Sequence, residues 1–154
     1  QTRLFFNFYF FRALKKSGLA HLYFDHLDTW YGMLDYGYTT CGEWGNLETD
    51  RSDCHAWSAT PVFDYMNILL GIDASKPGFK EVEVKPTFGK LDQLKGSFPH
   101  PKGAITIELT KTGKKVEGKI NLPAGLQGEL QLGKKTNNLK SGTNNIKIES
   151  NAIK

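Results

Sequence analysis

The chain has 154 residues, of which 39% are hydrophobic and 23% charged, a composition typical of a globular protein with one domain or two small ones. No apolar run of about 18 residues occurs, so we expect no membrane-spanning helix. The net charge of +4 comes from dispersed lysines without a groove-reading motif, which argues against a nucleic-acid partner. Two cysteines and four scattered histidines predict neither a disulfide scaffold nor a metal site, and we expect no cofactor.

The first part of the chain predicts three helices. Residues 4–17 are apolar on nearly every side, as in a helix with several neighbours, and Gly18 stands where a glycine ends a helix. Apolar residues at helical spacing predict a second helix over 19–33 and a third over 58–70, with Pro61 in its first turn. Three helices with this much apolar surface cannot close a core alone. We therefore expect partner helices in a longer protein, or self-association through the exposed faces.

The pattern changes near residues 71–78, where Pro77-Gly78 marks a turn. Short runs in which apolar and polar residues alternate then follow, at 82–84, 104–109, 116–122, 126–132 and 146–148. Such runs, separated by glycine-containing turns, predict an antiparallel β-sandwich with one apolar and one lysine-rich face. The sequence thus predicts an α+β chain with a helical part at 1–76 and a sandwich at 77–154.

A long irregular stretch over residues 35–57 joins the second and third predicted helices. It contains several carboxylates, one histidine, one arginine and two tryptophans. Because tryptophan faces stack on sugars and carboxylates accept hydrogen bonds from sugar hydroxyls, the composition suits a carbohydrate cleft. Cys41 and Cys54 also lie here; they could pair across the loop, although we favour free, buried thiols.

This stretch resembles the last catalytic segment of bacterial α-L-rhamnosidases of glycoside hydrolase family 78. The resemblance rests on Thr39-Thr40-Cys-Gly-Glu43-Trp44 and on Ser52-Asp-Cys-His55-Ala-Trp57-Ser58-Ala-Thr-Pro61. Gly71-Ile72, Pro77-Gly78-Phe79 and Val84-Lys-Pro86 resemble the hinge between the barrel and the C-terminal sandwich of these enzymes. The resemblance implies the end of an (α/α)6 barrel followed by the sandwich, hence the C-terminal portion of such an enzyme.

These enzymes hydrolyse terminal α-L-rhamnosides with inversion, so the implied partner is a rhamnose-containing oligosaccharide or glycoside. By resemblance, Glu43 takes the position of the general base, His55 contacts the bound sugar, and Trp44 and Trp57 shape the pocket or stack on it. The general acid of the family lies far upstream, so we expect the 154-residue chain alone to be inactive. One departure is that the family usually has a bulky residue, often tryptophan, just before the glutamate, where this chain has Gly42.

Other interpretations remain open at this stage. Glu43 could be a solvated loop carboxylate, His55 a core histidine bonded to a backbone carbonyl, and Trp57 a core residue. The aromatic residues of the first helix are interpreted as core packing. The sandwich could be a carbohydrate-binding accessory module, although all three tryptophans precede Gly71; the helical part could be an interaction domain without a sugar role. No targeting signal is evident, and a periplasmic or extracellular bacterial location is the interpretation that we favour.

Overall fold

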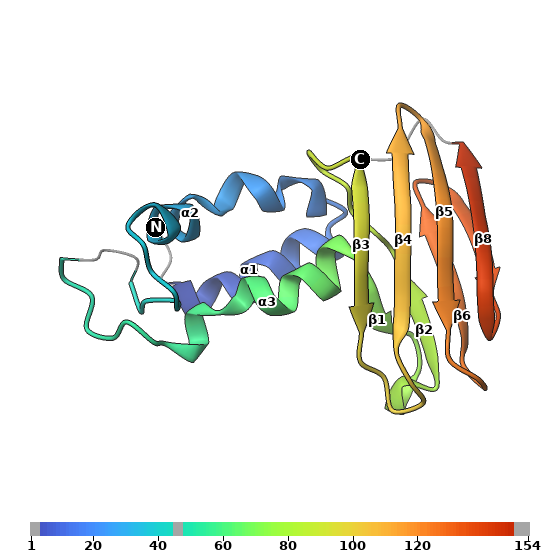
Figure 1. Cartoon of the computed structure of the whole chain (residues 1–154), viewed down its shortest axis with the longest axis horizontal. Coiled ribbons are helices and arrows are strands. Elements are labelled where there is room, and N and C mark those ends of the chain that lie inside the picture. Colours follow the sequence, from blue (N-terminus) through green and yellow to red (C-terminus); the bar gives the residue numbers. More distant parts are fainter. Residues whose placement is uncertain (1–3, 45–47, 150–154) are drawn as a thin grey trace. The chain divides into compact units, whose positions relative to one another are not determined.

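The computed structural model describes residues 4–44 and 48–149 (Figure 1). The chain divides into two compact units, Gln1–Asp64 and Tyr65–Lys154. The first unit is helical and the second holds the strands, as the sequence predicted for an α+β chain. Among the described residues, no helix is both long enough and apolar enough to cross a membrane.

Helix α1 spans Leu4–Lys16, close to the predicted bounds. Its buried residues Leu4, Phe11 and Leu14 recur at helical spacing along one face. The helix ends where Leu19 N–H donates to the Leu14 carbonyl (2.8 Å) and Gly18 adopts a φ of 73°. A positive φ at this position is the usual reason for a glycine after a helix.

The single helix predicted over 19–33 is wrong, because the chain forms two shorter helices there. A 3₁₀ helix, η1, spans Ala20–His26, and α2 spans Asp28–Asp35. Leu27 joins them with a φ of −98° and a ψ of 1°, outside the helical region. This break lets the rings of Tyr23 and Trp30 both reach Phe11, with centroids 4.8 and 6.1 Å away. Over seven residues, spacing alone does not separate a 3₁₀ helix from an α-helix.

The third predicted helix, over 58–70, is also segmented. The 3₁₀ helix η2 (Ala56–Ser58) precedes α3 (Thr60–Asp64), and a π-helical turn, η3 (Tyr65–Leu69), follows directly. The π-helical turn is marked by the bond from Leu70 N–H to the Tyr65 carbonyl (3.0 Å), five residues earlier. The first unit ends with α3 and the second begins with η3.

Asp64, the last residue of α3, is completely buried. Burial raises the pKa of its carboxyl to about 7, and the Thr60 hydroxyl and Arg12 guanidinium, which favour the charged form, offset this only in part. The folded chain therefore holds this proton up to about pH 7, whereas an unperturbed carboxyl releases it near pH 3.8. The contribution of Asp64 to stability is thus full below pH 3.8 and is lost as the pH rises to about 7.

Replacing Asp64 with Asn is expected to raise the free energy of unfolding at pH 8 by about 2 kcal/mol, because a neutral amide carries no desolvated charge. This increase in the free energy of unfolding should become smaller towards pH 5, because the Asp64 carboxyl of the folded wild type is protonated there. Thermal unfolding at pH 5 and 8, followed by tryptophan fluorescence, checks this, since every tryptophan precedes Asp64. An equal effect of the substitution at both pH values would contradict the assignment.

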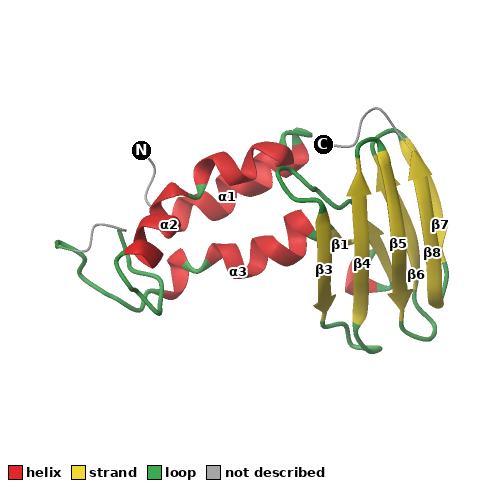
Figure 2. Cartoon of the chain, turned by 45° about the horizontal axis from the view of Figure 1, so that its top comes forward, coloured by secondary structure: helices red, strands yellow, loops and turns green. Residues whose placement is uncertain are grey.

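The second unit is built from two four-stranded sheets (Figure 2). One has the order β1-β2-β6-β7, formed by Ile72–Ala74, Glu81–Val84, Gln127–Leu132 and Lys135–Leu139. The other has the order β3-β4-β5-β8, formed by Gln93–Phe98, Ile105–Thr112, Lys115–Leu122 and Gly142–Glu149. A short 3₁₀ turn, η4 (Pro77–Phe79), separates β1 from β2.

The two sheets form the predicted sandwich, with alternation in β4 as the clearest example. Ile105, Ile107 and Leu109 are buried, while the residues between them are exposed. On the exposed side, Glu108 pairs with Lys119 (3.1 Å) in the lysine-rich surface that the sequence predicted. One feature departs from a purely antiparallel arrangement, because β2 and β6 pair in parallel, whereas the other pairs of described strands are antiparallel.

Candidate functional site

The irregular loop between α2 and η2 is folded back on itself into two arms. Glu43 N–H donates to the Ser52 carbonyl (2.9 Å), and His55 N–H donates to the Cys41 carbonyl (2.8 Å). The Thr40 hydroxyl adds a bond to the Asp53 carbonyl. These bonds bring residues 40–43 alongside residues 52–55 and so place Glu43 and His55 within one small region.

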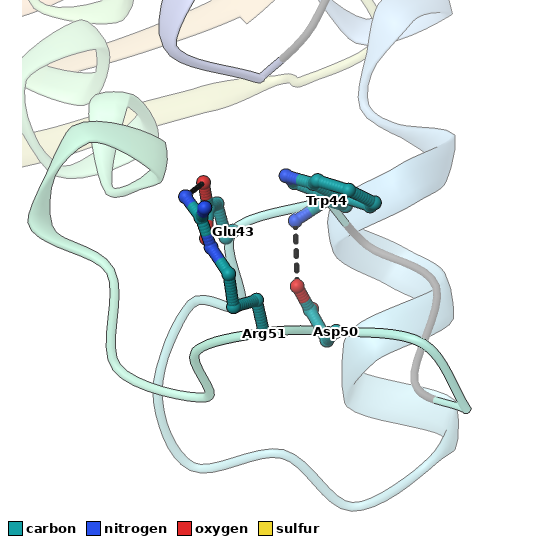
Figure 3. Close-up of polar contacts among 4 residues, drawn as sticks. All are labelled: Glu43, Trp44, Asp50 and Arg51. Atoms are coloured by element: carbon teal, nitrogen blue, oxygen red, sulfur yellow. Dashed lines mark hydrogen bonds and ion pairs between the residues drawn. The ribbon is translucent and has the colours of Figure 1, made fainter.

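Glu43 lies at the centre of this loop, where its carboxylate faces Arg51 (Figure 3). Arg51 Nη2 lies 2.5 Å from Oε1 and Arg51 Nε lies 3.0 Å from Oε2, a two-pronged ion pair. The hydrogen bonds from Arg51 hold the pKa of Glu43 below its usual value, with smaller contributions in the same direction from Trp44 and His55. Glu43 is therefore an ionised carboxylate, the form that a general base requires.

Gly42, where the chain departs from the family pattern before Glu43, lies against the Asp50 side chain. Asp50 Oδ1 accepts a hydrogen bond from Trp44 N–H (2.8 Å), which directs its side chain inwards (Figure 3). A β-carbon on residue 42 would lie 2.0 Å from Asp50 Oδ2. A side chain before Glu43 would therefore displace the Asp50 carboxylate from the place that it occupies in this loop.

The second arm of the loop ends at His55, and Trp57 follows two residues later. The imidazole of half-buried His55 meets the Trp57 indole edge-to-face, with centroids 6.1 Å apart. Trp57 is exposed and contacts Phe5 of α1 (5.8 Å between centroids), so it is not a core residue of the described chain. Trp44 is also exposed. Glu43 and Trp44 thus lie on one arm of the loop, while His55 lies on the other arm and contacts Trp57.

An apolar hollow of about 530 Å³ lies next to Trp57 in the first unit. It is lined by Phe5, Phe8, Tyr9, Ala56, Trp57, Ala59, Thr60 and Phe63. Phe5, Phe6 and Tyr9 are exposed in this chain, because α1 buries only one face here. That they pack in a core with partner helices of a longer protein stays a prediction. The sequence missed the hollow, since it depends on bringing α1 against η2 and α3.

Cys41 and Cys54 are free thiols, as expected, but the expectation that both are buried is wrong. Cys54 is exposed, and Cys41 is half-buried. Partial burial, with a smaller effect of Cys54, raises the pKa of the Cys41 thiol. Among the described residues, no group of three or more His, Cys, Asp or Glu side chains is arranged to hold a metal ion.

Comparison with known proteins gives two kinds of match. The family model of the bacterial alpha-L-rhamnosidase C-terminal domain matches residues 71–147, half of the chain. No curated protein sequence matches the chain at the similarity that we required. Among solved structures, the family 78 rhamnosidase of Bacillus sp. GL1 matches 85% of the chain at 28% identity, with a TM-score of 0.78.

Two further rhamnosidase structures support the fold. The enzyme of Aspergillus terreus matches 94% of the chain at 18% identity and a TM-score of 0.78. That of Streptomyces avermitilis, determined with L-rhamnose, matches 75% at 16% identity and a TM-score of 0.64. The chain spans only 15%, 19% and 14% of the lengths of these three proteins, respectively. The sandwich and its family model together show that the chain belongs to the bacterial α-L-rhamnosidase family, whose C-terminal domain it carries at residues 71–147.

Proposed function

We propose that this chain forms the C-terminal part of an inverting α-L-rhamnosidase and supplies its general base, Glu43. The observation that carries the proposal is the Glu43 carboxylate, which is bonded at both oxygens by Arg51 on a loop that also presents His55 and two indoles. The α-L-rhamnosidase that matches the chain at 28% identity supports the enzyme class, and the L-rhamnose complex of the Streptomyces enzyme supports the sugar. In this function, His55 bonds the sugar while Trp44 and Trp57 stack on it or close the pocket.

An inverting glycosidase needs two carboxyl groups with different tasks. One carboxylate takes a proton from the attacking water, and the other carboxyl group, roughly 6.5–9.5 Å away, protonates the leaving oxygen. The carboxylates near Glu43 have other partners, since Asp50 binds Trp44 N–H and Asp53 accepts a bond from the Tyr38 hydroxyl (3.4 Å). We therefore assign the general acid to a part of the enzyme outside this chain.

The sandwich has a polar groove of about 530 Å³ along β2, β6 and β7. Its lining includes Glu81, Glu83, Gln127 and Asn138, and no aromatic side chain is part of it. Sugars are commonly held by stacking on an aromatic ring, and this groove offers none. We therefore place sugar contact on the loop around Glu43 and assign the sandwich a structural role.

Hydrolysis of an aryl α-L-rhamnoside tests this function. A longer rhamnosidase that contains this chain should release rhamnose that is first detected as the β-anomer by proton NMR, because inversion places water on the opposite face. The isolated chain should show no turnover above the uncatalysed rate. Release of the α-anomer would contradict the inverting mechanism, and turnover by the isolated chain would contradict the external position of the acid.

A further inference from the structure

Arg51 contacts both oxygens of the Glu43 carboxylate, and this contact is fixed by the backbone. Glu43 N–H is bonded to the carbonyl of Ser52, the residue after Arg51. On the same two arms of the loop, Trp44 N–H donates to the side chain of Asp50, the residue before Arg51. Glu43 and Arg51 therefore face each other from paired segments of the loop (Figure 3).

The two partners differ in their exposure to solvent. The Glu43 side chain is 12% exposed, whereas that of Arg51 is 73% exposed. The guanidinium thus lies on the solvent side of a carboxylate that is otherwise shielded.

An ionised carboxylate has about four acceptor positions, of which the fork of Arg51 uses two and the Trp44 side chain uses another. About one position is left for a water molecule or a sugar hydroxyl. A two-pronged bond also fixes the plane of the carboxylate, which a single contact from a lysine does not do.

We propose that Arg51 is a positioning residue for Glu43 and orients its carboxylate before the attacking water is activated. This inference rests on the proposed role of Glu43 as general base. Of the groups around Glu43, Arg51 has the largest effect in lowering its pKa, and Trp44 and His55 act in the same direction. Asp50 is directed at Trp44 N–H instead. Arg51 therefore sets the lowest pH at which the base is available.

Titration of the whole chain tests the contact without any need for activity. The carboxyl carbon of Glu43, followed by NMR against pH, should titrate below 4.5 in the wild type. In Arg51→Gln the pKa of Glu43 should rise towards its ordinary value of 4.5. In Arg51→Lys the pKa of Glu43 should lie between those in the wild type and in Arg51→Gln. Lys76→Gln, which removes the cation of an exposed ion pair with Glu81 in the second unit, is the matched control and should leave the titration of Glu43 unchanged. An unaltered Glu43 titration in Arg51→Gln overturns the proposal.

A second experiment measures kcat/KM against pH in a rhamnosidase that contains this chain. Arg51→Gln should shift the acidic limb of this pH profile to higher pH and lower kcat about 10-fold. Arg51→Lys should return the acidic limb close to its wild-type position. A merely structural role would lower activity without moving the limb, and that result would overturn the proposal while Glu43 remains the base. If the NMR titration moves but Glu43→Gln retains full turnover, the proposed function of Glu43 fails, and this inference fails with it although the ion pair itself is real.

Discussion

Replacing Glu43 with Gln in a rhamnosidase that contains this chain is expected to lower kcat by about 10³-fold, with KM nearly unchanged. The amide has the size of the carboxylate and still accepts a bond from Arg51, so the loop should keep its shape. Because the amide cannot take a proton from water, no base assists the attack of water in the transition state. Steady-state kinetics with an aryl α-L-rhamnoside measure the effect.

Two controls make this result specific to Glu43. Glu48→Gln alters an exposed carboxylate of the same loop and should leave turnover within about twofold of the wild type. Added azide needs no base to attack the sugar, so it should restore activity to Glu43→Gln and give the β-glycosyl azide. Full turnover in Glu43→Gln, or no rescue together with a raised KM, would show that this residue binds substrate or supports the loop instead.

Replacing Gly118 with Ala is expected to destabilise the sandwich by about 3 kcal/mol or more. Gly118 lies within β5 at a φ of 146°, and a β-carbon there would lie 2.0 Å from the Glu108 carbonyl oxygen of β4. Both the backbone conformation and the contact with a neighbouring strand exclude a side chain. Thermal unfolding followed by far-ultraviolet circular dichroism should show the loss, and the amides of β4 and β5 should exchange faster.

Gly142→Ala is the matched control for this prediction. Gly142 also has a positive φ, 86°, but no atom lies within 4 Å of a β-carbon built on it. Its replacement should therefore cost only about 1 kcal/mol, the price of the strained backbone alone. Equal losses for the two variants would mean that the close approach of β4 to Gly118 contributes nothing.

The elements that could be predicted are those whose signal is local. Alternation and turn glycines predicted a strand over 116–122, and β5 spans Lys115–Leu122. In both the β4–β5 and β6–β7 hairpins, a glycine with positive φ (Gly113 and Gly133) opens a two-residue turn between paired strands. Such turns need a particular residue at a particular place, so the sequence displays them.

The features that could not be predicted depend on contacts between distant residues. Alternation in 82–84 gives a strand but not its partner or direction, so the parallel pairing with β6 was not evident. The break at Leu27 allows Tyr23 and Trp30 both to contact Phe11, and neither it nor the change to a π-helical turn at η3 alters the apolar spacing much. In the loop, a motif singled out Glu43, but nothing in the spacing indicated that Arg51, eight residues later, would bond it.

The parallel pair formed by β2 and β6 has a consequence for the order in which the sandwich assembles. Residue 81 meets residue 127, so this pairing closes a loop of 46 residues that contains β3, β4 and β5. Closing a loop of that length costs more entropy than closing the two-residue turns of the β4–β5 and β6–β7 hairpins. The hairpins should therefore form early, and the ladder between β2 and β6 should be the slow step that completes the fold.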